Sequence, residues 1–328
     1  MTMTSERTAE SASSVSEAPP RGYVASDVSI VIPTFGRDEV LVDTIRSCLE
    51  QTPPAGEILV VDQTPTHSVE TQSILQAWHD SGRIRWERRI EASQPAAMNH
   101  ALLCATKPLV LFLDDDIIPQ AGFVAAHAAA HGSPEVWVVV GQIIQPWQQP
   151  SDVPPPDSLD ALRADFDFPF HSTRPAELQN VMSGHMSVVR DRALALGGFD
   201  ENFHGAAYRF DTEFGRRVLH AGGRILFEPA ASIRHLRAAR GGTRIQGDHL
   251  ASASPNHGVG DYYFALLHGW RVDVVRYVSR RLIREVCTKF HLRHPWYIPV
   301  KLVGEVRALC WAWQLRRRGP ALIRRPVP

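Results

Sequence analysis

The chain has 328 residues, of which 44% are hydrophobic and 21% charged, a composition typical of a folded globular protein. Acidic and basic residues are equal in number, but from Ala265 to the end 14 Lys and Arg stand against 3 Asp and Glu, so this part carries +11 and the first 264 residues carry −11. An acidic body with a basic tail argues against nucleic acid as the main partner. It favours a protein whose body uses a metal and whose tail meets an anionic surface.

The N-terminal segment, residues 1–26, is rich in Ser, Glu, Ala and Pro and is predicted to be a disordered leader. It has no apolar stretch of the kind found in secretory signals, and no run of about 18 apolar residues predicts a membrane-spanning helix. The four cysteines lack metal-ligand spacing, which is typical of reduced thiols in a cytosolic protein. The predicted location is therefore cytoplasmic.

Hydrophobic patterning then predicts alternating strands and helices. Strands are expected at 28–33, 57–62, 84–87 and 109–113, and helices at 38–51, 68–80 and 96–106. This alternation is typical of βαβ units on a mostly parallel sheet, whose ligands bind beyond the carboxyl ends of the strands. A Pro-rich irregular segment follows at 146–178, then a second ordered block at 179–240 and a basic helical region from about residue 254.

The strand at 109–113 runs into three adjacent carboxylates, Asp114, Asp115 and Asp116. Such a cluster is electrostatically costly unless a cation lies nearby, and Mg²⁺ and Mn²⁺ are bound by carboxylates together with substrate phosphates. Because alternate residues of an extended segment point the same way, Asp114 and Asp116 are predicted to face one ligand. The alternative is a solvated acidic turn that caps a helix beginning near Pro119, and the triplet alone leaves both open.

Three other polar positions each allow two interpretations. Asp62 ends the second strand, where a carboxylate either accepts hydrogen bonds from a nucleotide or caps the turn. Asp211 and Glu213 begin a predicted helix, where Asp211 is either a general base for an alcohol or an ordinary first-turn cap. His235 follows a strand and is either structural or a further ligand for the cation at Asp116.

Taken in order, a series of segments resembles the family 2 glycosyltransferases of the GT-A fold. They are SIVIPTFGR, EILVVDQT, QPAAMNHAL, LVLFLDDDIIP, GHMSVVRDRALALGGFDENF, FDTEFGRRVLHAG and IRH. The resemblance covers residues 28–235 and implies an α/β fold, with a Rossmann-like mostly parallel sheet flanked by helices. It divides the chain into the leader (1–26), a nucleotide-sugar-binding half (27–145), an acceptor-side half with the Pro-rich loop (146–250) and a basic helical C-terminal region (251–328).

The resemblance also implies roles for residues on the donor side. Pro33 and Thr34 would lie against the nucleoside, and Asp62 would contact the base. Asn99 would border the diphosphate or ribose, and Asp114 would face the ribose.

The remaining implied roles concern the metal and the chemistry. Asp115 is grouped with the donor-contacting residues, and Asp116 would bind Mn²⁺ or Mg²⁺ with help from His235. Asp211 would be the general base that takes the proton of an acceptor hydroxyl on a glycan, lipid-linked or small molecule. A nucleotide-diphosphate sugar would be the donor, and a single displacement would invert the anomeric configuration.

Two positions depart from the family's pattern. Met98 stands where the family often has Arg, so a positive charge near the diphosphate is missing, and Arg209 or Arg234 are candidates to replace it. Phe210 stands where a Glu usually precedes the base.

Other classes of function are weaker. A nucleotidyltransferase would show a Gly-rich phosphate loop after the first strand, where this chain reads PTFGRDE. A non-catalytic subunit that binds a nucleotide sugar is the remaining alternative. The basic C-terminal helices are predicted either to pack as a cap on the catalytic domain or to make a peripheral contact with anionic membrane at its inner face.

Overall fold

The computed structural model describes residues 22–154, 161–242 and 249–324. The predicted leader falls mainly on residues 1–21, which lie outside this described part. Order begins earlier than predicted, because Ala25 is buried in a short 3₁₀ helix, η1 (Ala25–Asp27), just before the first strand.

The first half of the domain follows the predicted alternation to within a few residues. Its elements are β1 (Val28–Thr34), α1 (Glu39–Leu49), β2 (Glu57–Asp62), α2 (Val69–Asp80), β3 (Arg85–Arg88), α3 (Gln94–Cys104) and β4 (Leu109–Leu113). β1, β2 and β4 are mostly apolar and buried on both faces, which is typical of parallel sheets covered by helices, whereas β3 at the edge of the sheet is polar. Two helices begin at serine caps, since the Oγ atoms of Ser68 and Ser93 accept hydrogen bonds from backbone N–H groups of the first turn.

The chain then continues through elements of mixed direction. They are β5 (Ile117–Pro119), α4 (Phe123–Ala130), β6 (Val136–Ile144), η2 (Ala161–Arg163), β7 (Ala176–Leu178), β8 (His185–Val189), α5 (Arg190–Ala195), α6 (Phe210–His220) and β9 (Arg224–His235). The idea that the three aspartates cap a helix near Pro119 is wrong. Residues 117–119 form a strand, and the next helix begins only at Phe123.

All of the strands join one nine-stranded sheet, in the order β3-β2-β1-β4-β8-β6-β9-β5, with β7 added on β9. The strands β1 to β4 are parallel to one another, whereas β8 lies antiparallel between β4 and β6. The sheet therefore runs across the predicted boundary at residue 145, because β6 from the first half pairs only with strands of the second.

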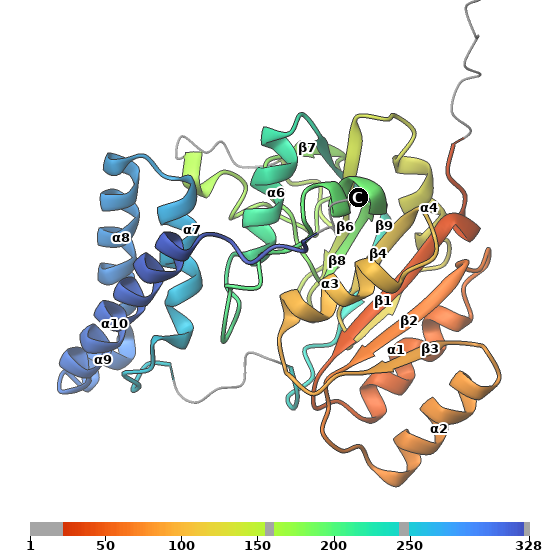
Figure 1. Cartoon of the computed structure of the whole chain (residues 1–328), viewed down its shortest axis with the longest axis horizontal. Helices are drawn as coiled ribbons and strands as arrows, with labels where there is room; N and C mark the ends of the chain where they lie inside the picture. Colours follow the sequence, from red (N-terminus) through yellow and green to blue (C-terminus); the bar gives the residue numbers. More distant parts are fainter. Residues whose placement is uncertain (1–21, 155–160, 243–248, 325–328) are drawn as a thin grey trace, which may run out of the picture.

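Alternate residues of the strands feed two apolar cores on opposite faces of this sheet. Ile30 and Ile32 of β1 belong to the core that includes residues of α1 and α4, whereas Val31 belongs to the core that includes residues of α3, α6 and the C-terminal helices. Figure 1 shows helices on both faces of the central sheet. The predicted fold class, an α/β sheet flanked by helices with a helical C-terminal extension, is confirmed.

The C-terminal region consists of helices that pack beside α6, at the end of the molecule opposite α2 (Figure 1). They are η3 (Pro255–His257), α7 (Val259–His268), α8 (Arg271–Val286), α9 (Lys289–Arg293) and α10 (Tyr297–Arg318). Tyr262, Tyr263 and Phe264 of α7 are fully buried, and beyond α10 the N–H of Ile323 donates to the carbonyl of Gly197 (2.8 Å). In the described residues, no helix is long and apolar enough to cross a bilayer.

Candidate active site

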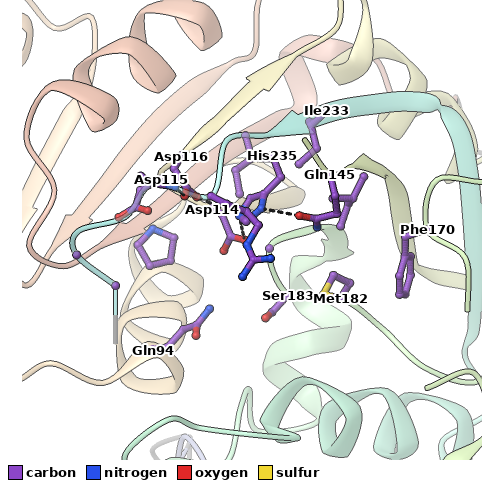
Figure 2. Close-up of a pocket in the computed structure, with 18 of the residues that line it drawn as sticks. Gln94, Asp114, Asp115, Asp116, Gln145, Phe170, Met182, Ser183, Ile233 and His235 are labelled. Carbon is purple, nitrogen blue, oxygen red and sulfur yellow. Dashed lines mark hydrogen bonds and ion pairs between the residues drawn. The ribbon is translucent and has the colours of Figure 1, made fainter. Parts of the chain in front are cut away.

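A cavity of about 890 Å³ opens at the carboxyl ends of β1 and β4, where ligands of such sheets bind (Figure 2). Segments that are far apart in the sequence form its walls, among them the end of β1, the acidic residues after β4, and the chain on either side of the end of β9. Residues 143–148, 167–171 and 182–184 also contribute to the lining. The predicted residues that line it are Pro33, Thr34, Asp114, Asp115, Asp116 and His235.

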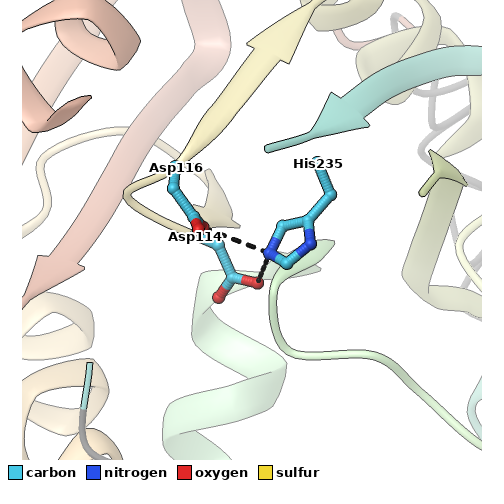
Figure 3. A group of neighbouring side chains, drawn as sticks. All are labelled: Asp114, Asp116 and His235. Atoms are coloured by element: carbon cyan, nitrogen blue, oxygen red, sulfur yellow. Dashed lines mark ion pairs between the residues drawn. The ribbon is translucent and has the colours of Figure 1, made fainter. Parts of the chain in front are cut away.

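Asp114, Asp116 and His235 point toward one another in this cavity (Figure 3). Nε2 of His235 lies 3.1 Å from a carboxylate oxygen of Asp116 and 3.6 Å from one of Asp114, and the three ligand atoms lie within 4.8 Å of one another. Two carboxylates and an imidazole fit a divalent cation such as Mn²⁺ or Mg²⁺, which takes mainly oxygen ligands. The other ring nitrogen of His235 lies 3.2 Å from Oε1 of Gln145, a contact that fixes the orientation of the ring.

The ionisation of the pair suits a cation as well. Burial alone would raise the pKa of Asp116, but the hydrogen bond and charge of His235 lower it below the usual range. Burial alone would lower the pKa of His235, but its contact with Asp116 and the charge of Asp114 raise it. Asp116 therefore stays ionised at neutral pH, and a cation that binds here would displace the proton that His235 carries beside it.

Asp115 points away from this cluster, as alternation predicts. Its carboxylate accepts a hydrogen bond from the hydroxyl of Thr34 (2.7 Å) and lies 3.3 Å from Nε of Arg37. Burial raises the pKa of Asp115 to about 7, against the opposing charge of Arg37. Asp115 thus ties the end of β4 to the end of β1, so its polar contacts are with the protein.

Arg37 lines the cavity beside the carboxylates, and the sequence did not single it out. It is buried, and its Nη2 lies 3.3 Å from Asp116. Its Nη1 donates to the carbonyls of Ala238 and Arg240, which holds the segment after β9 against the turn after β1. A signal for it existed, since three adjacent carboxylates at the end of a strand need a countercharge and PTFGR, at the end of another predicted strand, ends in an arginine.

Neither arginine suggested as a replacement for the charge missing at Met98 reaches the cavity. Arg209 pairs with Asp261 (3.0 Å) in the C-terminal region, and Arg234 is exposed on β9. Among the described residues, the arginines that line the cavity are instead Arg37 and Arg237.

Asp62, Asn99 and Asp211 are not among the described residues that line the cavity. The carboxylate of Asp62 is fully buried and accepts hydrogen bonds from Trp86 (3.0 Å), the backbone of Thr64 (2.8 Å) and, at 2.8 Å, His67. Its neighbour Gln63 lines the cavity in its place.

Asn99 spans two elements of the domain. Its amide nitrogen donates to the carbonyl of Phe199 and to Glu201, both at 2.8 Å, and its oxygen accepts from the N–H of Phe199 (2.7 Å). The side chain therefore links α3 to the segment after α5.

Asp211 lies in the first turn of α6, in contact with a residue that lines the cavity. Its carboxylate lies 3.3 Å from both the N–H and the hydroxyl of Ser183, and Ser183 lines the cavity (Figure 2). Glu213 points elsewhere, into a buried bidentate pair with Arg217 (both 2.7 Å). Of the two acidic residues that begin α6, Asp211 is the one next to the cavity.

Solved structures place this fold among the glycosyltransferases of the GT-A type. The mannosyltransferase PcManGT from Pyrobaculum calidifontis, solved with GDP-Man and Mn²⁺, is similar over 93% of this chain and 82% of that one (TM-score 0.52, 19% identity). Residues 1–349 of S. aureus TarS give a TM-score of 0.53 at 14% identity over 86% of this chain and 80% of that one. GalNAc-T7, solved with UDP, GalNAc and Mn²⁺, gives 0.53 at 16% identity over 65% of this chain and 44% of that one.

The sequence gives the family itself. The model of the family described as Glycosyl transferase family 2 matches residues 29–197, just over half of the chain, and the chain belongs to this family. The predicted family and fold are therefore confirmed.

Curated relatives agree with the predicted enzyme class. The pre-mycofactocin glycosyltransferase of Mycobacterium tuberculosis is 26% identical over 221 residues, 66% of this chain and 44% of that protein. The validoxylamine A glucosyltransferase of Streptomyces hygroscopicus subsp. limoneus is 30% identical over 111 residues, 33% of this chain and 24% of its own. The chain thus spans less than half the length of these relatives.

Proposed function

We propose that the chain is an active glycosyltransferase that moves a sugar from a nucleoside diphosphate donor to an acceptor hydroxyl with inversion. The observation that carries the proposal is the convergence of Asp114, Asp116 and His235 in the large cavity of a family 2 chain. Two structural neighbours whose names include a nucleotide also contain Mn²⁺. We extend both ligand classes, nucleotide and divalent cation, to this cavity.

Asp116, His235 and Asp114 would hold Mn²⁺ or Mg²⁺. When bound, such a cation offsets the negative charge that develops on a diphosphate leaving group. Pro33 and Thr34 line the part of the cavity assigned to the nucleoside, with Gln63 beside them. The carboxylate of Asp62 is already hydrogen-bonded within the protein, so Asp62 would affect donor binding indirectly, by fixing the end of β2. Asn99 would also act indirectly, by joining α3 to the acceptor side.

Asp211 would take the proton from the acceptor hydroxyl as that oxygen attacks the anomeric carbon. It lies in the first turn of α6, as a carboxylate that can accept a proton. Ser183 holds the carboxylate toward the cavity. One displacement needs no second nucleophile, so the anomeric configuration inverts.

The predicted contact with anionic membrane remains a proposal. The buried faces of α7 and α10 form the predicted cap, but Trp270, Trp296 and Trp313 are more than half exposed beside basic residues. Exposed tryptophans next to arginines suit a peripheral contact with anionic lipid, near a lipid-linked acceptor.

The test is a donor assay with the purified full chain. Candidate nucleotide sugars, beginning with UDP-linked and GDP-linked ones, are incubated with Mn²⁺ or EDTA, and free nucleotide is measured with and without sugar acceptors. We expect release that requires Mn²⁺ or Mg²⁺. Tight nucleotide binding without turnover of any donor would favour the non-catalytic alternative.

A further inference from the structure

The turn that leads into α6 has an unusual backbone. Ala207 and Arg209 both have positive φ angles, 48° and 72°, although neither is glycine. Side-chain-bearing residues rarely adopt this conformation, and they keep it only where the surrounding structure holds them. Asp211 follows two residues after Arg209, so the strained turn determines where this carboxylate lies.

The first turn of α7 provides that support. Nε of Arg209 lies 3.0 Å from Oδ1 of Asp261, and the guanidinium lies 3.6 Å from the ring centre of Phe166. Next to Asp261, a Cβ atom placed on Gly260 would collide with the carbonyl oxygen of Tyr208. Only glycine allows the backbone of α7 to approach the turn this closely.

Asp261 is itself held rigidly by the rest of the C-terminal region. It is buried, accepts a hydrogen bond from the hydroxyl of Tyr277 on α8 (2.9 Å) and pairs with Arg281. Arg281 also pairs with Glu305 of α10 (3.0 Å), so α7, α8 and α10 share one buried charge network. Through Arg209, this network contacts the turn that leads into α6.

We propose that the C-terminal helices position the catalytic base: Gly260 and Asp261 hold the turn at Tyr208 and Arg209, and through it the carboxylate of Asp211 beside Ser183. Asp261 is thus a positioning residue that acts through Arg209. This inference rests on the proposed role of Asp211 as the base.

Three variants isolate the contact. Gly260→Ala pushes α7 away from the Tyr208 carbonyl, and Asp261→Asn removes the charge that pairs with Arg209. Tyr262→Phe is the matched control, because it removes a buried hydrogen bond to Glu305 (2.7 Å) from the same helix turn, on the side of the α10 network. Arg209→Lys keeps the charge but loses the planar group over Phe166, and serves if Asp261→Asn does not fold.

The first measurement is hydrogen–deuterium exchange of residues 206–214, which requires no substrate. We expect faster exchange there in Gly260→Ala, Asp261→Asn and Arg209→Lys, and wild-type exchange in Tyr262→Phe. Wild-type exchange in all three turn variants would overturn the inference, whatever the enzyme's activity.

The second measurement separates positioning from packing. In sugar transfer, kcat should fall roughly 10- to 100-fold in the turn variants, because small displacements of a reacting group have effects of this size. The Kd of UDP or GDP in Mn²⁺ should stay within about twofold of wild type, because the turn does not contact the donor side. Faster exchange with an unchanged kcat would overturn the positioning role, whereas a wild-type chain without turnover would count against the proposed function alone.

Discussion

Nε2 of His235 lies 3.1 Å from the carboxylate of Asp116 because their strands pair: Ile117, the residue after Asp116, is in register with His235 in the antiparallel contact of β5 with β9. The pairing of β5 with β9 therefore builds the cation site, because it places Asp116 and His235 at the same edge of the sheet. The N–H of Ala238 donates to the Asp116 carboxylate (2.8 Å) and Gln145 contacts the ring of His235 (3.2 Å), so the protein itself holds both side chains in place.

Asp116→Ala tests this site directly. The variant should bind Mn²⁺ at least 10- to 100-fold more weakly, since perturbing even the residues around a metal ligand has effects of that size. The measurement is calorimetric titration with Mn²⁺, and thermal unfolding checks the fold. Asp191→Ala is the control, because its side chain is 88% exposed on α5. Unchanged Mn²⁺ affinity in Asp116→Ala would remove this residue from the metal site.

Asp211→Asn tests the base. The amide keeps the size of the carboxylate but cannot take a proton, so the rate of sugar transfer should fall by roughly 10²–10⁴. Donor affinity, measured by calorimetry, should barely change. Asp191→Asn is a better control here than Glu213→Gln, because Glu213 is buried in its pair with Arg217 and its loss should lower the free energy of unfolding by about 1–3 kcal/mol. Transfer at the wild-type rate by Asp211→Asn would mean that another group is the base.

Arg37→Ala should make the fold depend on metal. Without the guanidinium, the buried Asp115 and Asp116 lose a countercharge, and removing one partner of such a cluster destabilises by about 3–5 kcal/mol. Mn²⁺ should restore a larger share of the unfolding free energy in the variant than it adds to wild type. Urea unfolding with Mn²⁺ and with EDTA measures the difference. An equal effect of Mn²⁺ on both proteins would contradict this account of Arg37.

His67→Gln should destabilise the chain in a pH-dependent way. Burial alone would lower the pKa of His67, but Asp62 and Asp38 raise it, while the pKa values of both carboxyls lie below their usual range. Protonated His67 stabilises the fold fully below the ordinary histidine pKa, and this stabilisation is lost as pH rises through the raised pKa. The ionised carboxylates stabilise the fold fully above their ordinary pKa values, and this stabilisation is lost as pH falls through the lowered pKa values.

The window of greatest effect is therefore near pH 5–6. There, urea unfolding of His67→Gln should show a loss of roughly 1–3 kcal/mol, and the loss should shrink toward about pH 9. A loss that stays constant over this range would show that His67 acts through packing alone.

The exposed C-terminal surface predicts binding to anionic vesicles. The chain should co-sediment with phosphatidylserine-containing liposomes at low salt and dissociate as salt rises, since screening shortens the reach of the basic side chains. The double variant Trp296→Ser with Trp313→Ser should bind more weakly. Trp147→Ser is the control, an exposed tryptophan outside the C-terminal helices. Equal sedimentation with neutral and anionic vesicles would contradict a preference for anionic lipid, and no sedimentation with either would leave only the packed cap.

Local signals predicted the elements up to β4 well. Buried apolar strands and serine caps act within a few residues, so the alternation from Val28 to Leu113 could be read directly. The resemblance to family 2 predicted that Asp116 and His235 lie together, and the pairing of β5 with β9 brings them within 3.1 Å of each other.

The features that were not foreseen depend on partners far along the chain. Burial of Asp62 is decided by Trp86 and His67, and the role of Arg37 by carbonyls that come some 200 residues later. The antiparallel placement of β8 between β4 and β6 likewise follows from tertiary pairing. No periodicity within a single segment reports such contacts.

The position of β8 has a consequence for the order in which the protein can form during its synthesis. β6 leaves the ribosome before either of its sheet neighbours, β8 and β9, has been made, and one side of β4 also waits for β8. During that interval the apolar sequence VWVVV of β6 is a nascent strand without a partner, of the kind that pairs with other chains. A stalled or truncated nascent chain that stops before His185 would expose this strand, so the chain needs protection by chaperones most at that stage.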